Sequence, residues 1–132
     1  MTTIDEALNA MTKPELVRLV KRIKSRTFYL MTKDDVLYVQ WEEASQQATD
    51  AMKAYIAMGD PVSKATAESI RATDAMLAAM KAGKSTAKLL RAMDAAEAAR
   101  DKLAAEKDRL WAAYERHNKR ADRLWQELES ER

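Results

Sequence analysis

The last 47 residues of the chain, 86–132, contain neither glycine nor proline. These two residue types most disfavour a helix interior, so the segment can form one uninterrupted helix roughly 70 Å long at about 1.5 Å per residue. The whole chain of 132 residues has only two glycines and two prolines. The sequence therefore predicts a single all-α domain, 1–132, built as an antiparallel helical bundle or coiled-coil hairpin.

The start of the chain carries the signals of two short helices. Thr12 supplies a hydroxyl cap, Pro14 lies in the first turn that follows, and Glu15 places a carboxylate three residues after the cap. This combination is typical of a helix start. We expect a helix over residues 13–26 and a shorter one over residues 3–11.

A third helix start is expected just after these two. Thr32 and Asp35 repeat the pattern of a hydroxyl with a carboxylate three residues later. The apolar stretch before them, 27–31, is interpreted as a buried connection. Residues 1–31 are thus expected to form a basic N-terminal helical pair, and the next helix is expected to begin at Lys33.

The following segment, 33–82, is interpreted as a helical hairpin. Its first helix has apolar and small residues spaced by four and three, which is the period of an antiparallel helix seam: Leu37, Trp41, Ala44, Ala48, Ala51, Tyr55 and Met58. Gly59 is expected to end this helix, Asp60 to cap the next, and Pro61 to occupy its first position. These signals predict a tight reversal at Gly59.

The second helix of that hairpin, 62–82, is rich in small residues, and its main apolar anchors are expected to be Ile70, Leu77 and Met80. Gly83 ends it. The long C-terminal helix, 85–132, continues the four-and-three spacing through Leu89, Met93, Ala96, Arg100, Leu103, Lys107, Leu110, Tyr114, His117, Ala121, Leu124 and Leu128. The polar stretch 115–122 is the place where this helix could kink or break.

Charge is distributed unevenly, although the net charge of the chain is only +2. Residues 1–33 carry +4, residues 34–83 carry −4, and the remainder carries +2. The basic residues of the N-terminal helix are Arg18, Lys21, Arg22, Lys24 and Arg26. On a helix, Arg18, Lys21 and Arg22 share a face opposite Leu16, Leu19, Val20 and Ile23. Three interpretations stay open: a solvated face, a contact with an acidic protein, or a contact with nucleic-acid phosphates.

Catalytic and cofactor sites lack the residues they need. The chain has no cysteine, and His117 is its one histidine. No Glu-x-x-His pair occurs, as a di-metal helical bundle would require, and no closely spaced glycines occur to cradle a phosphate. We therefore expect no enzymatic activity, no catalytic residues, no metal and no cofactor.

An apolar strip near the C-terminus is the main candidate for partner binding. It consists of Leu110, Trp111, Tyr114, Leu124, Trp125 and Leu128. If residues 1–30 fold back onto it, the strip is core. If they do not, exposed aromatic residues at this density indicate a dimer or a protein partner.

The expected function is a non-catalytic helical interaction module that acts as an adaptor or inhibitor. It binds another protein, or a second copy of itself as a homodimer, by helix packing, and a small-molecule substrate is not expected. The alternative is a nucleic-acid-binding protein that uses its basic N-terminal helix and oligomerises through its long helices. No stretch is apolar enough to span a membrane, which with the missing cysteines favours the cytoplasm. In style the chain is similar to phage or plasmid accessory proteins.

Overall fold

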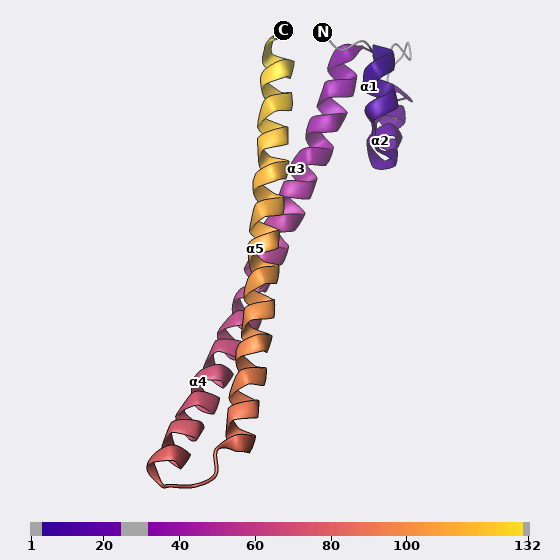
Figure 1. Ribbon diagram of the computed structural model, residues 1–132. Coiled ribbons are helices and arrows are strands. Elements are labelled where there is room, and N and C mark those ends of the chain that lie inside the picture. Colours follow the sequence, from indigo (N-terminus) through magenta and orange to yellow (C-terminus); the bar gives the residue numbers. More distant parts are fainter. Residues whose placement is uncertain (1–3, 25–31, 131–132) are drawn as a thin grey trace. The chain divides into compact units, whose positions relative to one another are not determined.

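The computed structural model describes residues 4–24 and 32–130, and within these residues the chain forms five helices and no strand. In order along the chain they are α1 (Ile4–Ala10), α2 (Lys13–Lys24), α3 (Lys33–Ala57), α4 (Gly59–Lys81) and α5 (Ala87–Ser130). Figure 1 labels each of them. The prediction of an all-α helical bundle is confirmed. The connection expected at 27–31 lies outside the described residues, as does Arg26.

The chain divides into two compact units. The first takes its residues from Met1–Asp50 and Ala113–Arg132, and the second is Ala51–Ala112. The long helices α3 and α5 therefore each contribute one part to each unit. The two units are described separately below.

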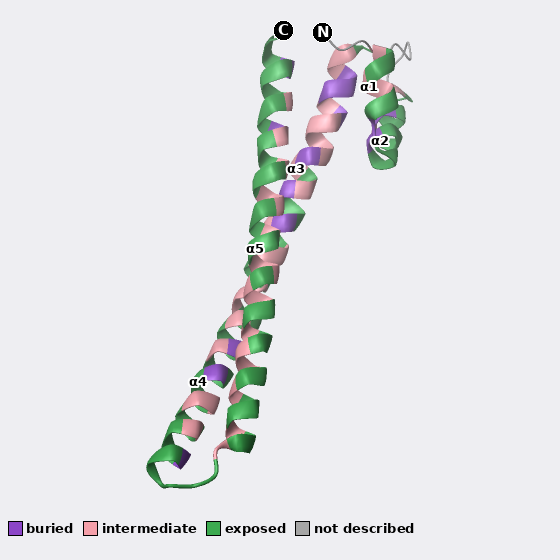
Figure 2. Ribbon diagram, viewed as in Figure 1, coloured by how far each residue is buried: buried purple, intermediate pink, exposed green. Residues whose placement is uncertain are grey.

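In the first unit, α1 and α2 pack with α3 around a core of large apolar side chains. Met11, Leu19, Val36 and Val39 are buried there, and Ile23 packs partly buried beside them. On α5, Leu128 is almost completely buried. Figure 2 shows the buried residues of α3 in purple. This core fixes which side of α2 faces inward.

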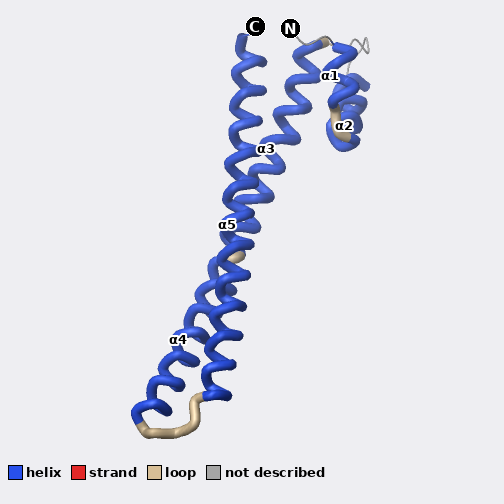
Figure 3. The backbone as a smooth tube through the Cα atoms, in the orientation of Figure 1, coloured by secondary structure: helices blue, strands red, loops and turns tan. Residues whose placement is uncertain are grey.

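The second unit contains α4 and the first part of α5 as an antiparallel pair, together with the end of α3. A side-chain contact between α4 and α5, in which Arg100 Nη1 donates a hydrogen bond to Ser69 Oγ over 3.4 Å, sets their register. The reversal between the helices lies at Gly83, in the loop coloured tan in Figure 3. Gly83 has φ +68°, and the amide of Lys84 donates to the carbonyl of Ala79 over 2.9 Å. This pattern is a Schellman motif, which favours glycine at that position.

The prediction of a tight hairpin at Gly59 is wrong. Met58 keeps right-handed helical dihedrals, its amide donates to Ala54, and its carbonyl accepts from Val62. The helical hydrogen bonds thus pass through the junction, and α4 begins at Gly59 without a side-chain cap from Asp60. Because Pro61 has no N–H to offer the carbonyl of Ala57, the result is a bend between two helices.

The apolar anchors expected on α4 are also placed differently. Ile70, Leu77 and Met80 are exposed. The residues that are buried or half-buried instead are mostly smaller and follow the same four-and-three spacing: Val62, Ala65, Ser69, Ala72, Met76 and Ala79. Small side chains allow the two helix backbones to approach closely. Small residues therefore occupy most seam positions of α4, and the larger residues lie beside the seam.

The seams expected on α3 and α5 are confirmed. Every residue listed for them, from Leu37 to Met58 and from Leu89 to Leu128, is buried or half-buried. The polar stretch 115–122 does not interrupt α5, which runs without a break from Ala87 to Ser130. Among the described residues, no helix combines the length and the apolar character needed to cross a membrane.

Candidate functional site

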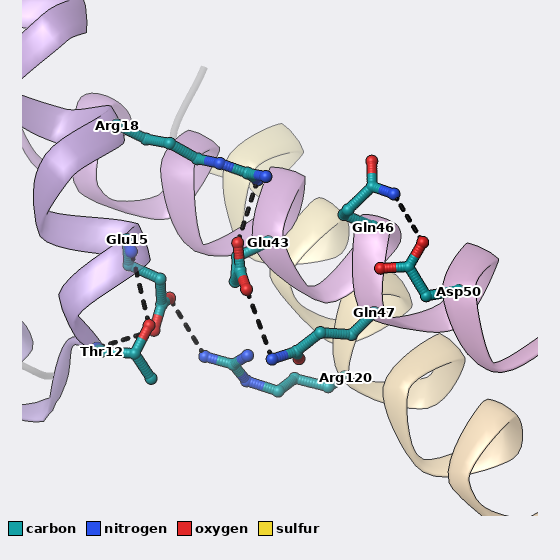
Figure 4. Close-up of polar contacts among 8 residues, drawn as sticks. All are labelled: Thr12, Glu15, Arg18, Glu43, Gln46, Gln47, Asp50 and Arg120. Atoms are coloured by element: carbon teal, nitrogen blue, oxygen red, sulfur yellow. Dashed lines mark hydrogen bonds and ion pairs between the residues drawn. The ribbon is translucent and has the colours of Figure 1, made fainter. Parts of the chain in front are cut away.

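Two arginines of α2 point toward acids of α3 in the first unit. Arg18 Nη1 lies 3.2 Å from Glu43 Oε2, as Figure 4 shows. Arg22 Nε donates to Asp35 Oδ1 over 2.8 Å, and its guanidinium lies 4.1 Å from the centre of the Tyr38 ring. The side of α2 that carries these arginines therefore faces α3.

Glu15 holds the start of α2 against α5. Its carboxylate accepts a hydrogen bond from the amide of Thr12 over 3.0 Å, and the amide of Glu15 donates to the Thr12 hydroxyl over 3.4 Å. The second carboxylate oxygen accepts from Arg120 Nη2 over 3.3 Å (Figure 4). Glu15 is completely buried. The expected cap is thus confirmed, and it also makes a long-range ion pair.

Asp35 repeats this arrangement at the start of α3. Its carboxylate accepts from the amide of Thr32 over 2.9 Å and from the Thr32 hydroxyl over 3.0 Å. Because it also pairs with Arg22, the buried carboxylate both caps α3 and ties it to α2. Buried charges are tolerated in proteins when they are paired and hydrogen-bonded in this way.

The outer side of α2 presents an apolar surface framed by lysines. Leu16, Val17 and Val20 are exposed. They line one shallow depression together with Lys13, Lys21 and Lys24. The one acid of α2, Glu15, is buried on the opposite side. We call these six residues the α2 surface; it combines three branched apolar side chains with three positive charges.

This arrangement differs from the expected one. The sequence places Arg18, Lys21 and Arg22 on one wet face and Leu16 and Val20 on the buried one. In the structure the two arginines make ion pairs with α3, Lys21 and Lys24 are exposed, and Leu16 and Val20 are exposed as well. The most exposed positive charges of α2 are therefore lysines interleaved with apolar side chains, whereas Arg18 and Arg22 are half-buried.

The aromatic strip expected on α5 is divided between the units. In the first unit, Trp125 packs on Trp41 of α3, with ring centroids 5.1 Å apart, and its indole N–H donates to Glu129 over 2.8 Å. Trp125 remains 37% exposed. Tyr114 and Leu124 are half-buried, and Leu128 is buried. Here α3, which follows residues 1–30, supplies the ring that covers Trp125.

In the second unit, Trp111 packs on Tyr55 in the same manner, with ring centroids 5.2 Å apart. Lys107 Nζ lies 5.0 Å from the centre of the same tyrosine ring. Leu110 is half-buried, and Trp111 is 40% exposed. Each tryptophan of the strip thus has one face covered by an aromatic ring of α3 and retains some exposed area.

Another hollow of the first unit lies away from the α2 surface. A groove of about 640 Å³ is lined by residues of α1, α3 and α5, among them Lys33, Arg120 and Glu127. Arg120 is already paired with Glu15. His117 is half-buried on the seam of α5, as expected. In the described part of the chain, no group of histidine, aspartate and glutamate side chains is arranged to hold a metal ion.

Comparison of the chain with protein-family models, with curated proteins and with solved structures found no match.

Two surfaces emerge that the sequence reasoning missed. The sequence pattern does not predict the α2 surface, because Arg18 and Arg22 of α2 pair with Glu43 and Asp35 on the next helix, α3. The exposed row on α4 differs from the prediction because Ile70, Leu77 and Met80 lie beside the seam rather than in it. A signal for the second was present in the sequence: Ala65, Ser69, Ala72, Met76 and Ala79 keep the spacing of the seam on their own.

Proposed function

We propose that this protein is a cytoplasmic, non-catalytic interaction module that acts as an adaptor or inhibitor. It binds an acidic protein segment through the α2 surface. The observation that carries the proposal is the outward position of Leu16, Val17 and Val20 within a frame of lysines. A group of exposed apolar side chains rimmed by polar residues is typical of a surface that binds another protein. The action is binding and occlusion, without turnover.

The chemistry of the surface defines the partner. Three aliphatic side chains favour an apolar stripe on the partner, such as the face of an amphipathic helix. Lys13, Lys21 and Lys24 favour acidic side chains beside that stripe, because complementary charges speed association and fix the register of the two surfaces. The partner is therefore an acidic amphipathic helix.

A nucleic-acid partner is favoured less. Phosphate recognition relies on cations and hydrogen-bond donors, with arginine prominent among them. Arg18 and Arg22, the two arginines of the described part of α2, each pair with an acid of α3. The centre of the exposed surface is aliphatic, and aliphatic side chains gain little from a phosphate backbone. Binding to duplex DNA is kept as an outcome of the test.

The test measures fluorescence anisotropy with a synthetic acidic amphipathic peptide in which leucines at helical spacing are flanked by glutamates. The wild-type protein should bind it, the affinity should fall with added salt, and a peptide with lysines in place of the glutamates should not bind. The variant Val17→Asp with Val20→Asp should lose binding. A second variant, Lys21→Glu with Lys24→Glu, should lose it while keeping the apolar centre intact.

A matched control is Ala75→Asp with Ala78→Asp, which adds the same two charges at exposed positions of α4 and should bind like wild type. Circular dichroism checks that each variant stays helical. Labelled duplex DNA and anionic lipid vesicles are titrated in parallel. Binding to either of them that is lost on Lys21→Glu with Lys24→Glu, without binding to the acidic peptide, would overturn the proposal.

A further inference from the structure

The second unit fully buries none of its large apolar side chains. The residues it buries are small: Ala51, Ala65, Ser69 and Ala79. Six large ones are exposed instead, namely Ile56, Ile70, Leu77, Met80, Leu90 and Trp111. A helix that is apolar on two sides needs a neighbour on each of them. Over most of their length in this unit, α4 and α5 provide only one neighbour for each other.

On α4 the exposed Ile70, Leu77 and Met80 form a second row beside the seam together with the half-buried Thr66 and Thr73. Thr66, Ile70, Thr73, Leu77 and Met80 are again spaced by four and three. The hydroxyls of the two threonines donate to the carbonyls of Val62 and Ser69, over 2.9 and 3.0 Å. Their polar groups are therefore satisfied within the helix, and the row offers a partner mainly methyl and methylene groups.

The matching row of α5 lies on the same side of the unit. In an antiparallel helix pair, the positions that directly follow every second seam residue flank the seam on one common side. On α4 these are Thr66, Thr73 and Met80, and on α5 they are Leu90, Glu97, Ala104 and Trp111. Just outside the α5 row lie three exposed acids, Asp94, Asp101 and Asp108. We call the two rows with these acids the open face.

The open face has the size of a stable dimer interface. The 23 residues of α4 give a length of about 35 Å, and two helices side by side are about 20 Å wide, so that the face covers on the order of 700 Å². Stable interfaces bury about 800 Å² per partner.

We propose that the open face binds a second copy of the same chain. The two hairpins pair about a twofold axis parallel to their helices, so that α4 of each copy packs on α5 of the other in a four-helix bundle. A symmetric pairing of this kind uses one surface twice and closes on itself. Both copies then have the loop at Gly83 at the same end of the bundle.

Charge selects this arrangement over the reversed one. If the hairpins paired with opposite directions, α5 would face α5, and Asp94, Asp101 and Asp108 of the two copies would confront one another. Like charges opposed at an interface are unfavourable. In the proposed arrangement the acids of each copy lie at the edge of the apolar contact, beside the row on α4 of the other copy, and that row carries no acid.

Sedimentation velocity over a range of protein concentrations tests the self-association. The wild-type chain should form a dimer, and Ile70→Glu with Leu77→Glu should weaken it by more than roughly a hundredfold, because charges would enter an apolar interface. The control, Ala75→Glu with Ala78→Glu, adds equal charge to exposed positions off the open face and should remain dimeric. A wild-type monomer at all concentrations, or a dimer that ignores Ile70→Glu with Leu77→Glu, would overturn the proposal.

A single spin label tests the direction of the pairing. The chain has no cysteine, so Ser85→Cys in the loop gives one label per copy. The proposed bundle should give a label-to-label distance near the width of two helices, about 20 Å. A distance near the length of the hairpin, about 35 Å or more, would instead mean opposed directions and would contradict the proposed bundle. The α2 variants of the previous section should leave both results unchanged, so this proposal stands apart from the proposed function.

Discussion

Arg120 on α5 donates a hydrogen bond to Glu15 on α2 over 3.3 Å, although the two residues are 105 positions apart in the chain. The same carboxylate caps its own helix through the amide of Thr12. One buried side chain thus serves both a local and a long-range contact. Its replacement should weaken the attachment of α2 to the first unit as well as the helix start itself.

The first prediction is that Glu15→Ala lowers the free energy of unfolding by roughly 2 kcal/mol, which combines the loss of a cap with the loss of a partly solvated ion pair. Urea denaturation followed by circular dichroism measures it. Glu68→Ala, at an exposed position of α4, serves as the control and should change stability by no more than about 0.5 kcal/mol. Equal effects of the two substitutions would show that the buried carboxylate does not stabilise the fold.

The second prediction concerns the pair of Arg22 and Asp35. A double-mutant cycle with Arg22→Ala and Asp35→Ala should give a coupling energy of about 1–2 kcal/mol, because Asp35 is buried and charge-assisted hydrogen bonds are strong there. The pair of Arg109 and Glu106 on α5, whose side chains are both exposed, provides a comparison, for which the same cycle should give less than about 0.5 kcal/mol. A coupling for the α2–α3 pair that is no larger than this would contradict the prediction.

The third prediction is that one substitution has opposite effects at the two glycines. Gly83→Ala should destabilise the protein by about 1 kcal/mol, because φ +68° is unfavourable for a residue with a Cβ. Gly59→Ala should stabilise it by about 0.5 kcal/mol, because the site lies in helical backbone and no atom lies within 4 Å of the added Cβ. Thermal unfolding of both variants gives the signs. A stabilising Gly83→Ala would mean that the reversal of the chain lies elsewhere.

The fourth prediction concerns the ring contact of Trp41 with Trp125. A cycle of Trp41→Ala and Trp125→Ala should give a coupling of about 0.5–1.5 kcal/mol, the range found for tilted aromatic pairs. The equivalent cycle at Tyr55 and Trp111 should give a similar value, since the centroid distances differ by only 0.1 Å. Additive effects in both cycles would show that α5 does not pack on α3 through these rings.

Local signals predicted the starts of the helices well. The caps of Thr12 with Glu15 and of Thr32 with Asp35 involve residues only three positions apart. Each contact can therefore be predicted from a short stretch of sequence, without knowledge of the tertiary structure. The seams of α3 and α5 were also predictable, because a spacing of four and three residues places side chains on one side of any helix.

The junction at Gly59 shows where local signals stop being sufficient. Glycine followed by Asp60 and Pro61 weakens a helix in the same way whether the chain then reverses or merely bends. What decides between the two is whether Met58 keeps helical dihedrals, and this depends on the packing of α4 rather than on the residues of the junction. The sequence pattern correctly predicts an interruption between α3 and α4. It does not distinguish a bend from a reversal of the chain.

The orientation of α2 was not predictable for a related reason. An amphipathic helix normally turns its apolar side inward, and here Leu19 and Ile23 do so. Arg18 and Arg22 also turn toward α3, because they form ion pairs there with Glu43 and Asp35. Leu16, Val17 and Val20 then remain outside. Only the tertiary arrangement brings those acids to α2, so a reading of the helix by itself assigns its outer face wrongly.

The seam of small residues on α4 has an evolutionary consequence. Where Ala65, Ser69 and Ala79 meet α5, a larger side chain would force the two backbones apart, so substitutions at these positions are restricted by size alone. The positions of α4 that belong to neither the seam nor the open face carry no such restriction and can change freely in charge and shape. Homologous chains should therefore keep small residues at this four-and-three spacing even where the residue types differ. An alignment by side-chain volume at these positions should detect their relationship better than sequence identity does.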